Sequence, residues 1–420
     1  MRDTIKNFRS VLVANRGEIA ARIIRTAKVC GLKTIAIYTR ADETSPHVNL
    51  ADLSVCIGDG PIMDSYLSIE KIIDVAVSTK AEAIHPGYGF LSENPELSRA
   101  CKEKSIFFVG PSPEVIEIMG NKAEAKKLAA AAGVPCLPGS SLANVGNKSV
   151  SKIAKSLGYP LMIKAAAGGG GKGMRLVNQP EDLENALNRA KTEAKNVFAS
   201  EELILESALR SPRHIEIQIL GDIYGCVLHL GERDCSIQRR HQKIIEEAPC
   251  PTLKQHLRSK MGEMAIRLAQ KLNYFGAGTV EFLLDEKENF YFLEMNTRLQ
   301  VEHPVTEQIT GLDLVYLQLL VADKQRLPFK QEEVKFSGHA VEARLYAEDP
   351  SNKFLPSTGY LHVYDIPEFK GVRIDSGAVK GHHVTPFYDS MLAKVIGHGI
   401  TRDIAIDNLI SSLENSSISG

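Results

Sequence analysis

The sequence lacks the features that mark several large classes of protein. Its seven cysteines are scattered without a C-x-x-C pair, which argues against a disulfide framework and favours reduced thiols. The 50 basic residues nearly equal the 51 acidic ones, so no overall field would draw the chain to nucleic acid or an anionic membrane. No apolar run approaches the roughly 20 residues that span a bilayer. The polar N-terminus also lacks the apolar stretch of a signal peptide, so we expect a cytoplasmic protein.

The first forty residues carry the pattern of a β-α-β unit. Residues 11–14 predict a short buried strand, and residues 34–38 predict a second one. Between them, apolar side chains recur at helical spacing over residues 19–30, and Gly31 suits the end of a helix. Such a unit predicts a parallel sheet in an N-terminal domain. Its turn lacks the G-x-G-x-x-G sequence, so a dinucleotide site is not supported.

The length of 420 residues suggests two or three domains of mixed α/β structure. After the first unit, residues 121–132 predict a helix and residues 139–150 a polar loop. Residues 158–206 alternate strand, glycine-rich loop, strand, helix and strand, which indicates a small separate lobe. Strands and helices alternate over residues 213–323, and residues 338–399 hold β segments broken by glycine and proline.

Four consecutive glycines interrupt the small lobe. Residues 168–171 lie between an apolar strand that ends at Lys164 and another that begins at Met174, and Lys172 follows them. The G-x-x-x-x-G-K-[ST] sequence of a P-loop is absent, but bare backbone amides can approach a phosphate closely. A flexible linker is the alternative. The flanking strands and lysines favour a phosphate-covering loop, and the glycines suit a mobile lid over a nucleotide.

A predicted hairpin places two glutamates face to face. If its turn is centred between residues 287 and 288, Glu281 lies opposite Glu294. Facing like charges destabilise a hairpin, so a divalent cation between them is favoured. Asn296 lies two residues further on the same face and could add an oxygen ligand. The alternative is a pair of solvated glutamates on an edge strand.

Two polar segments carry candidate anion-binding groups. Arg298 and Glu302 lie four residues apart, and an arginine can hold bicarbonate while a carboxylate acts as a general base. An i, i+4 surface pair at the start of a helix is the simpler interpretation, which the residues alone favour. Residues 232–243 hold five basic side chains, which suit either a solvated face or the phosphates of an ATP-dependent enzyme.

Taken together, these segments resemble the biotin carboxylase family of the ATP-grasp superfamily. The resemblance covers nearly the whole chain. The sequence of residues 229–249 is most similar to that of the α subunits of methylcrotonyl-CoA or geranyl-CoA carboxylases. The motifs that carry the resemblance are VANRGEIAARIIR (13–25), HPGYGFLSEN (85–94), GPSPEVIEIMGNK (110–122), KAAAGGGGKGMR (164–175), SPRHIEIQ (211–218), GERDCSIQRRHQKIIEEAP (231–249) and FLEMNTRLQVEHPVTE (292–307).

The resemblance implies three parts in the chain. Residues 1–115 would form an N-terminal biotin carboxylase domain, and residues 122–323 an ATP-grasp domain whose mobile glycine-rich lid spans about 137–206. Residues 338–420 would form a β-rich C-terminal domain, expected to be incomplete because the family continues through a further strand and helices. The A-M-K-M motif of a biotinyl lysine is absent, so biotin is expected on a carrier domain elsewhere.

Site residues are also implied by the resemblance. ATP contacts would come from Lys122, Lys164, Gly169, Gly170, Gly171, Gly173, Met174, Glu206, Leu209, His214, Gln238, His241 and Gln242. The ligands of Mg²⁺ (or Mn²⁺) would be Glu281, Glu294 and Asn296. Bicarbonate and biotin would contact Tyr88, Lys243, Arg298, Gln300, Val301, Glu302 and Arg344. Among the catalytic groups, Arg298 and Lys243 would hold bicarbonate, Glu302 would deprotonate it, and Arg344 would stabilise the enolate of biotin.

The implied activity is carboxylation of biotin by MgATP and bicarbonate through carboxyphosphate, the first half-reaction of a biotin-dependent acyl-CoA carboxylase. Expected partners are a biotin carboxyl carrier domain, a carboxyltransferase subunit and, in a homodimer, a second copy of the chain. Ser207 departs from the family, in which many members carry a basic residue beside the adenine pocket. Two alternatives stay open: another carboxyphosphate-forming ligase similar to carbamoyl phosphate synthetase, and a truncated remnant that binds nucleotide without turnover. Residues 85–94 and 239–243 favour biotin.

Overall fold

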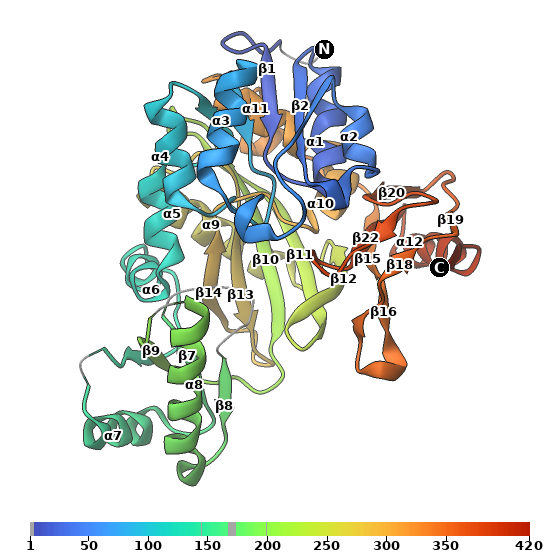
Figure 1. Cartoon of the computed structure of the whole chain (residues 1–420). Helices are drawn as coiled ribbons and strands as arrows, with labels where there is room; N and C mark the ends of the chain where they lie inside the picture. The colour runs from blue at the N-terminus through green and yellow to red at the C-terminus, as the bar shows by residue number, and fades with distance from the viewer. Residues whose placement is uncertain (1–3, 144, 167–173, 199) are drawn as a thin grey trace.

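The structure, a computed structural model, describes residues 4–143, 145–166, 174–198 and 200–420. Three larger sheets organise these ranges, one with five strands, one with four and one with eight (Figure 1). The mixed α/β class expected from the sequence is confirmed. None of the helices in these ranges combines the length and apolar character that a membrane crossing requires.

The N-terminal sheet is parallel, as the β-α-β pattern predicted. Its elements are β1 (Ser10–Val13), α1 (Gly17–Val29), β2 (Lys33–Tyr38), α2 (Pro46–Leu50), β3 (Leu53–Cys56), α3 (Ile69–Thr79), β4 (Ala83–His85), α4 (Pro95–Glu103) and β5 (Phe107–Phe108). The strand order is β3-β2-β1-β4-β5. Val11 and Val13 pack against α1 on one face, whereas Leu12 packs against α3 and α4 on the other. Helices therefore cover both faces, as parallel sheets require.

The four-stranded sheet forms the small lobe, which Figure 1 shows below the rest of the molecule. Two connecting helices, α5 (Pro113–Gly120) and α6 (Lys122–Ala131), lead into it. Its elements are β6 (Gly139–Ser141), α7 (Asn147–Leu157), β7 (Leu161–Ala165), β8 (Arg175–Val177), α8 (Leu183–Phe198) and β9 (Leu203–Ser207). The antiparallel order is β6-β9-β7-β8, and the apolar faces of α7 and α8 pack on it. The polar loop expected over residues 139–150 is wrong in part, because a strand and the start of a helix lie there.

The eight-stranded sheet is antiparallel throughout. Its order is β14-β13-β10-β11-β12-β15-β22-β20. The first five strands in space are β14 (Phe290–Asn296), β13 (Gly276–Leu284), β10 (Arg213–Gly221), β11 (Val227–Arg239) and β12 (Gln242–Ala248). The last three are β15 (His339–Tyr346), β22 (Met391–Gly399) and β20 (Val372–Ser376). The ladder between β12 and β15 thus joins residues 213–296 and residues 339–399 into one continuous surface.

Helices cover the large sheet on both sides. Helix α9 (Gln255–Lys271) packs its apolar face on β10 and β11. Helix α10 (His303–Thr310) lies across β11, β12 and β15, and α12 (Arg402–Glu414) packs on β15 and β22. Helix α11 (Leu314–Ala322) is almost wholly buried because it lies between α1 and β13, which ties the N-terminal sheet to the large one.

Short strands complete the C-terminal part. They are β16 (Glu348–Asp349) with β17 (Leu355–Pro356), β18 (Gly359–Tyr360) with β21 (His383–Val384), and β19 (Val363–Asp365) with β23 (Ser417–Ser419). The expected β-rich character of residues 338–399 is confirmed, and three of its strands, β15, β20 and β22, extend the large sheet.

Candidate active site

One cavity of about 910 Å³ lies between the small lobe and the large sheet, and it collects the predicted site residues. Every predicted residue that the structure describes lines this cavity. They are Tyr88, Lys122, Lys164, Met174, Glu206, Leu209, His214, Gln238, His241, Gln242, Lys243, Glu281, Glu294, Asn296, Arg298, Gln300, Val301, Glu302 and Arg344. The predicted Gly169, Gly170, Gly171 and Gly173 lie outside the described residues.

The hairpin of β13 and β14 places Glu281 opposite Glu294, as predicted, but by a different route. Next to the turn, Leu284 pairs with Phe290, so the turn is centred on residue 287, and the expected centre between 287 and 288 is wrong. A bulge between the pairs of Glu281 and Phe282 then shifts the register by one residue and brings the two glutamates together.

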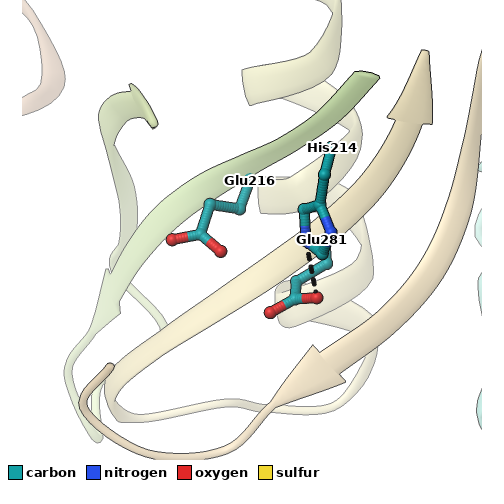
Figure 2. Close-up of side chains that lie close together, drawn as sticks. All are labelled: His214, Glu216 and Glu281. Atoms are coloured by element: carbon teal, nitrogen blue, oxygen red, sulfur yellow. Dashed lines mark ion pairs between the residues drawn. The ribbon is translucent and has the colours of Figure 1, made fainter. Parts of the chain in front are cut away.

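Glu281 is buried and surrounded by donors. Its Oε2 lies 2.8 Å from Nε2 of His214 on the neighbouring strand, the ion pair that Figure 2 marks. Its Oε1 accepts hydrogen bonds from Asn296 (2.8 Å) and Gln300 (3.0 Å). Burial alone would lower the pKa of His214, but the Glu281 carboxylate raises it. The imidazole therefore carries positive charge more readily than an ordinary histidine.

Glu294 differs from its partner because its side chain forms no hydrogen bond or ion pair with any described residue. Burial, with the neighbouring Glu281 carboxylate, raises the pKa of Glu294. A cation between the two carboxylates relieves this repulsion, and carboxylates with an amide are oxygen donors that suit Mg²⁺. The amide nitrogen of Asn296 donates to Glu281, and its oxygen accepts a hydrogen bond from Arg298 (3.0 Å), so the amide has to turn to offer an oxygen to a cation. The donor set fits Mg²⁺.

Lys243 forms the centre of the charged wall. Its Nζ lies 2.6 Å from Glu216, 3.0 Å from Glu281 and 2.6 Å from Glu302. Burial alone would lower the pKa of Lys243, but the three carboxylates hold it well above its usual value. The side chain is therefore held in its charged ammonium form. Figure 2 shows Glu216 beside the His214 and Glu281 pair on the same side of β10.

Glu302 bridges two cations at the end of the cavity. Its Oε1 contacts Lys243, and its Oε2 accepts a hydrogen bond from Arg344 at 3.0 Å. Burial alone would raise the pKa of Glu302, but Lys243, Arg344 and the buried Arg233 hold it well below its usual range. The carboxylate is therefore ionised in the resting enzyme.

Arg298 does not pair with Glu302, so the surface pair that the residues alone favoured is wrong. Helix α10 begins only at His303, and both side chains precede it. The Nε of Arg298 donates to Glu93 from the N-terminal part at 2.8 Å, and Nη1 donates to Gln300 at 3.0 Å. Both residues line the cavity instead of the surface.

The opposite wall carries lysines suited to a nucleotide. Glu206 on β9 accepts a hydrogen bond from Lys126 (2.7 Å) and forms an ion pair with Lys164 (2.6 Å). Lys122 lies nearby on α6, and burial lowers its pKa. Burial alone would raise the pKa of Glu206, but the two lysines hold it below its usual value. Two lysines are thus held at the cavity by one carboxylate, which phosphates can replace as the counter-charge.

A tight turn supplies further cavity residues. Arg240 and His241 connect β11 to β12, and both have positive φ angles, 51° and 68°. Two-residue hairpin turns with positive φ at both positions usually hold asparagine and glycine. Larger side chains in this conformation carry strain, which is common where the side chains serve a binding site. Beside the turn, Gln238 hydrogen bonds Nδ1 of His214 at 3.1 Å.

Sequence reasoning missed several charged residues that hold the predicted ones in place. They are Glu93, Lys126, Glu216, Arg233 and Glu246. Two of them had a usable signal in the sequence. Glu216 follows the predicted ATP contact His214 by two residues on one strand, and Lys126 follows the predicted ATP contact Lys122 by one helical turn. Glu93, Arg233 and Glu246 bond to partners distant in the chain, and local spacing carries no signal for them.

Three family models match consecutive parts of the chain. They are described as "Biotin carboxylase, N-terminal domain" (residues 7–116), "Carbamoyl-phosphate synthase L chain, ATP binding domain" (121–330) and "Biotin carboxylase C-terminal domain" (342–420). The central model is named for carbamoyl-phosphate synthase, and both flanking models are named for biotin carboxylase. Biotin carboxylase 2 of Bacillus subtilis is 49% identical over 413 residues, 98% of this chain and 93% of that protein. The chain belongs to the biotin carboxylase family.

Other relatives and solved structures agree with this assignment. The α subunit of rat mitochondrial methylcrotonoyl-CoA carboxylase is 49% identical over 98% of this chain and 58% of its own length. The biotin carboxylase domain dimer of Hydrogenobacter thermophilus 2-oxoglutarate carboxylase, solved with MgADP, ADP and bicarbonate, superposes with a TM-score of 0.96 at 47% identity, covering 99% of this chain and 91% of that one. A biotin carboxylase complex from Campylobacter jejuni superposes with a TM-score of 0.96 at 45% identity, covering 99% of this chain and 92% of that one.

The family decides the enzymatic class of the chain. It is an ATP-dependent ligase of biotin-dependent carboxylases, and it carboxylates biotin with bicarbonate. The ATP-grasp fold expected from the sequence is confirmed. The alternative of a ligase similar to carbamoyl phosphate synthetase is wrong, because both flanking domains are those of biotin carboxylase.

Proposed function

We propose that this biotin carboxylase performs both of its chemical steps around Glu302. The observation that carries the proposal is the double contact of this carboxylate, with Lys243 at 2.6 Å on one side and Arg344 at 3.0 Å on the other. Lys243 and Arg298 would hold bicarbonate, and Arg344 would face biotin. One carboxylate thereby lies between the two reacting groups.

In the first step, Glu302 accepts the proton of bicarbonate as the bicarbonate oxygen attacks the γ-phosphorus of ATP, and ADP leaves. The product is carboxyphosphate. The low pKa of Glu302 in the resting enzyme would make it a weak base. Lys243 and Arg344 cause much of that depression, and both would turn toward bound anions. Their withdrawal raises the proton affinity of the carboxylate when substrate is present.

The nucleotide would lie along the opposite wall. Lys122 and Lys164 offset the phosphate charge, and Glu206, Leu209, Met174 and His214 line the base and ribose pocket, with Gln238, His241 and Gln242 near the phosphates. Gln300 and Val301 lie beside bicarbonate. Glu281, Glu294 and Asn296 would hold Mg²⁺, which when bound offsets charge on the transferring phosphoryl group.

In the second step, carboxyphosphate breaks down to CO₂ and phosphate, and phosphate takes the proton from N1 of biotin. The nitrogen then attacks CO₂. Arg344 offsets negative charge on the ureido oxygen, and Tyr88 lies near the ring. A cavity closed against water protects carboxyphosphate from hydrolysis, which is the task we assign to residues 137–206 as a lid.

The remaining assignments follow from this chemistry. Residues 1–115, 122–323 and 338–420 act as the N-terminal, ATP-grasp and C-terminal domains, respectively. Biotin arrives on a carrier domain, and a carboxyltransferase subunit passes the carboxyl group to its acceptor. A homodimer is supported by the Hydrogenobacter domain dimer. The scattered cysteines, which form no C-x-x-C motif in the sequence, support a cytoplasmic location.

The test is phosphate release from MgATP with bicarbonate, with and without a high concentration of free biotin. The Glu302→Gln variant is assayed beside the wild type. We expect biotin to stimulate release in the wild type and the variant to lose both the stimulated and the basal rate. Release that depends on bicarbonate but ignores biotin would refute the second step. A variant that keeps the wild-type rate would refute the role of Glu302.

A further inference from the structure

A row of ionisable side chains lies buried behind the active site, on one face of the large sheet. The ladder sets Glu246 of β12 opposite Glu342 of β15, Arg344 opposite Lys394 of β22, and Lys394 opposite Asp375 of β20. Residues that pair directly across a ladder project to the same face, and so do residues two apart on a strand. Helices α1 and α10 pack over this part of the sheet.

Two carboxylates in this row are not accounted for by the mechanism. Glu246 and Glu342 are both fully buried, with 0% of their surface exposed. Oε1 of Glu246 accepts a hydrogen bond from Nε of Arg344 at 2.7 Å, but Oε2 has no partner among the described residues. Neither oxygen of Glu342 has a partner there. Three carboxylate oxygens on two side chains that pair across the ladder thus lack a described donor.

The cations of the row are already committed. Lys394 lies 3.1 Å from Glu18 and donates to the carbonyl oxygen of Val301 at 2.8 Å. Arg344 is shared between Glu246 and Glu302. No described cation is within hydrogen-bond distance of Glu342, whereas Glu246 has its arginine. An isolated buried carboxylate is costly unless it takes up a proton, so the proton belongs on Glu342.

The directions of the proton affinities agree with this placement. Burial raises the pKa of Glu342 well above its usual value, with Lys394 opposing and Glu246 adding to the rise. Burial also raises the pKa of Glu246, to about 7, although Arg344 opposes that rise. The charged and titratable groups around Glu342 include Glu246, Arg344, Lys394, Glu302 and Tyr88. Glu18 of α1 and Asp375 of β20 lie on the far side of Lys394, at 3.1 Å and 3.9 Å from its Nζ.

We propose that Glu342 is a neutral carboxylic acid that donates a hydrogen bond to Oε2 of Glu246, and that this acid and carboxylate pair positions the guanidinium of Arg344. The proposal rests on the function proposed above for Arg344. When Glu302 takes up a proton from bicarbonate, Arg344 loses one of its two anionic partners. Glu246, held from behind by Glu342, keeps the guanidinium charged and aimed at the cavity through the second step.

The pair also gives the enzyme a defined response to alkali. Ionisation of Glu342 would place a second carboxylate opposite Glu246 and remove the hydrogen bond that fixes it. Arg344 would then be drawn toward the sheet, away from biotin. We therefore expect part of the alkaline fall in kcat/KM for biotin to come from Glu342, with no matching change in the KM for ATP.

Four variants test the proposal: Glu342→Gln, Glu342→Leu, Glu246→Gln and, as a matched control, Glu247→Gln. A glutamine at 342 can still donate to Glu246, whereas a leucine cannot. We expect Glu342→Leu and Glu246→Gln to lower kcat/KM for free biotin about tenfold or more, because a small misplacement of a reacting group has such effects. Glu342→Gln should keep most of the wild-type kcat/KM for biotin. In this variant the fall of kcat/KM at alkaline pH should be smaller than in the wild type. Glu247 points to the opposite face, toward His339 and Arg402, so its variant should leave kcat/KM unchanged.

Infrared spectroscopy reads the proton independently of activity. The folded wild type at neutral pH should show the carbonyl stretch of a neutral carboxylic acid that Glu342→Gln lacks and that fades in the wild type as pH rises. If the wild type shows this band but no biotin-dependent turnover, the proposed function is refuted, whereas the assignment of a proton to Glu342 stands. A wild type without the band would overturn the inference, as would a Glu342→Gln variant as impaired as Glu342→Leu.

Discussion

Removal of the buried ammonium group of Lys243 should destabilise the fold far more than removal of an exposed one. In Lys243→Met, three carboxylates with 0–5% exposed side chains lose a cation that lies within 3.0 Å. Breaking one buried pair costs about 3–5 kcal/mol. Each carboxylate keeps a second cation, namely Arg233, His214 or Arg344, so the three losses do not simply add. We expect a total of about 3–5 kcal/mol, a large part of the ~5–15 kcal/mol that stabilises a typical protein.

The assay is urea unfolding followed by circular dichroism, with Lys254→Met as the control. Lys254 pairs with Glu288 at 2.6 Å, but the two side chains are 60% and 41% exposed, so its loss should cost about 0–1 kcal/mol. Lys243 holds the pKa of Glu281 and Glu302 down. Stability from such groups is present above the ordinary pKa of glutamate, about 4.3, and is lost as pH falls toward the lowered values. The difference between wild type and Lys243→Met should therefore shrink in acid. Equal losses in the two variants at neutral pH would refute the reasoning.

Three further outcomes are expected. Replacing the turn by Arg240→Asn with His241→Gly should raise the free energy of unfolding by about 1–2 kcal/mol by relieving left-handed strain, while raising the KM for ATP; an unchanged urea midpoint would contradict the strain. Glu294→Gln should raise the half-saturating concentration of Mg²⁺ about tenfold or more. In EDTA the variant should unfold no more easily than the wild type, because the amide removes the buried repulsion between residue 294 and the Glu281 carboxylate; easier unfolding in EDTA would contradict this. Because Glu342 has a raised pKa, the folded state holds its proton longer than the unfolded state does, and stability falls as pH rises between the two pKa values by up to about 1.4 kcal/mol per unit. Urea midpoints from about pH 5 to about pH 7 should therefore decline less in Glu342→Gln, and parallel curves would refute the assignment.

Local periodicity was enough to predict the elements whose partners are near in the chain. The strand, helix and strand at the N-terminus follow from the spacing of apolar residues, and the sheet they form is parallel as expected. The prediction that Glu281 faces Glu294 agrees with the structure, but it rested on a turn centre that is wrong. The bulge that brings the two glutamates together was not predictable, because one extra residue in a strand leaves no mark in a pattern of period two.

Electrostatic partners distant in the chain could not be predicted. Arg298 was expected at a helix surface, yet it lies before the helix and bonds to Glu93, 205 residues away. Arg344 bonds to Glu246, 98 residues away. Such pairs depend on the order of strands in the sheet and not on spacing along the chain. The predicted positions that the structure describes line one cavity, and the roles of the individual side chains stay predictions for kinetic tests.

The ladder between β12 and β15 also bears on how the protein could be divided. A cut in the connection between α11 and β15 would leave two fragments, each with an unpaired strand of complementary register, and would separate Glu246 from the rest of the buried charge row. Neither half could bury these groups alone, so each fragment should be prone to aggregation when made separately. When the two fragments are refolded together, their unpaired edge strands β12 and β15 can pair with each other again. This part of the molecule therefore offers a natural site for a split enzyme whose activity reports reassembly.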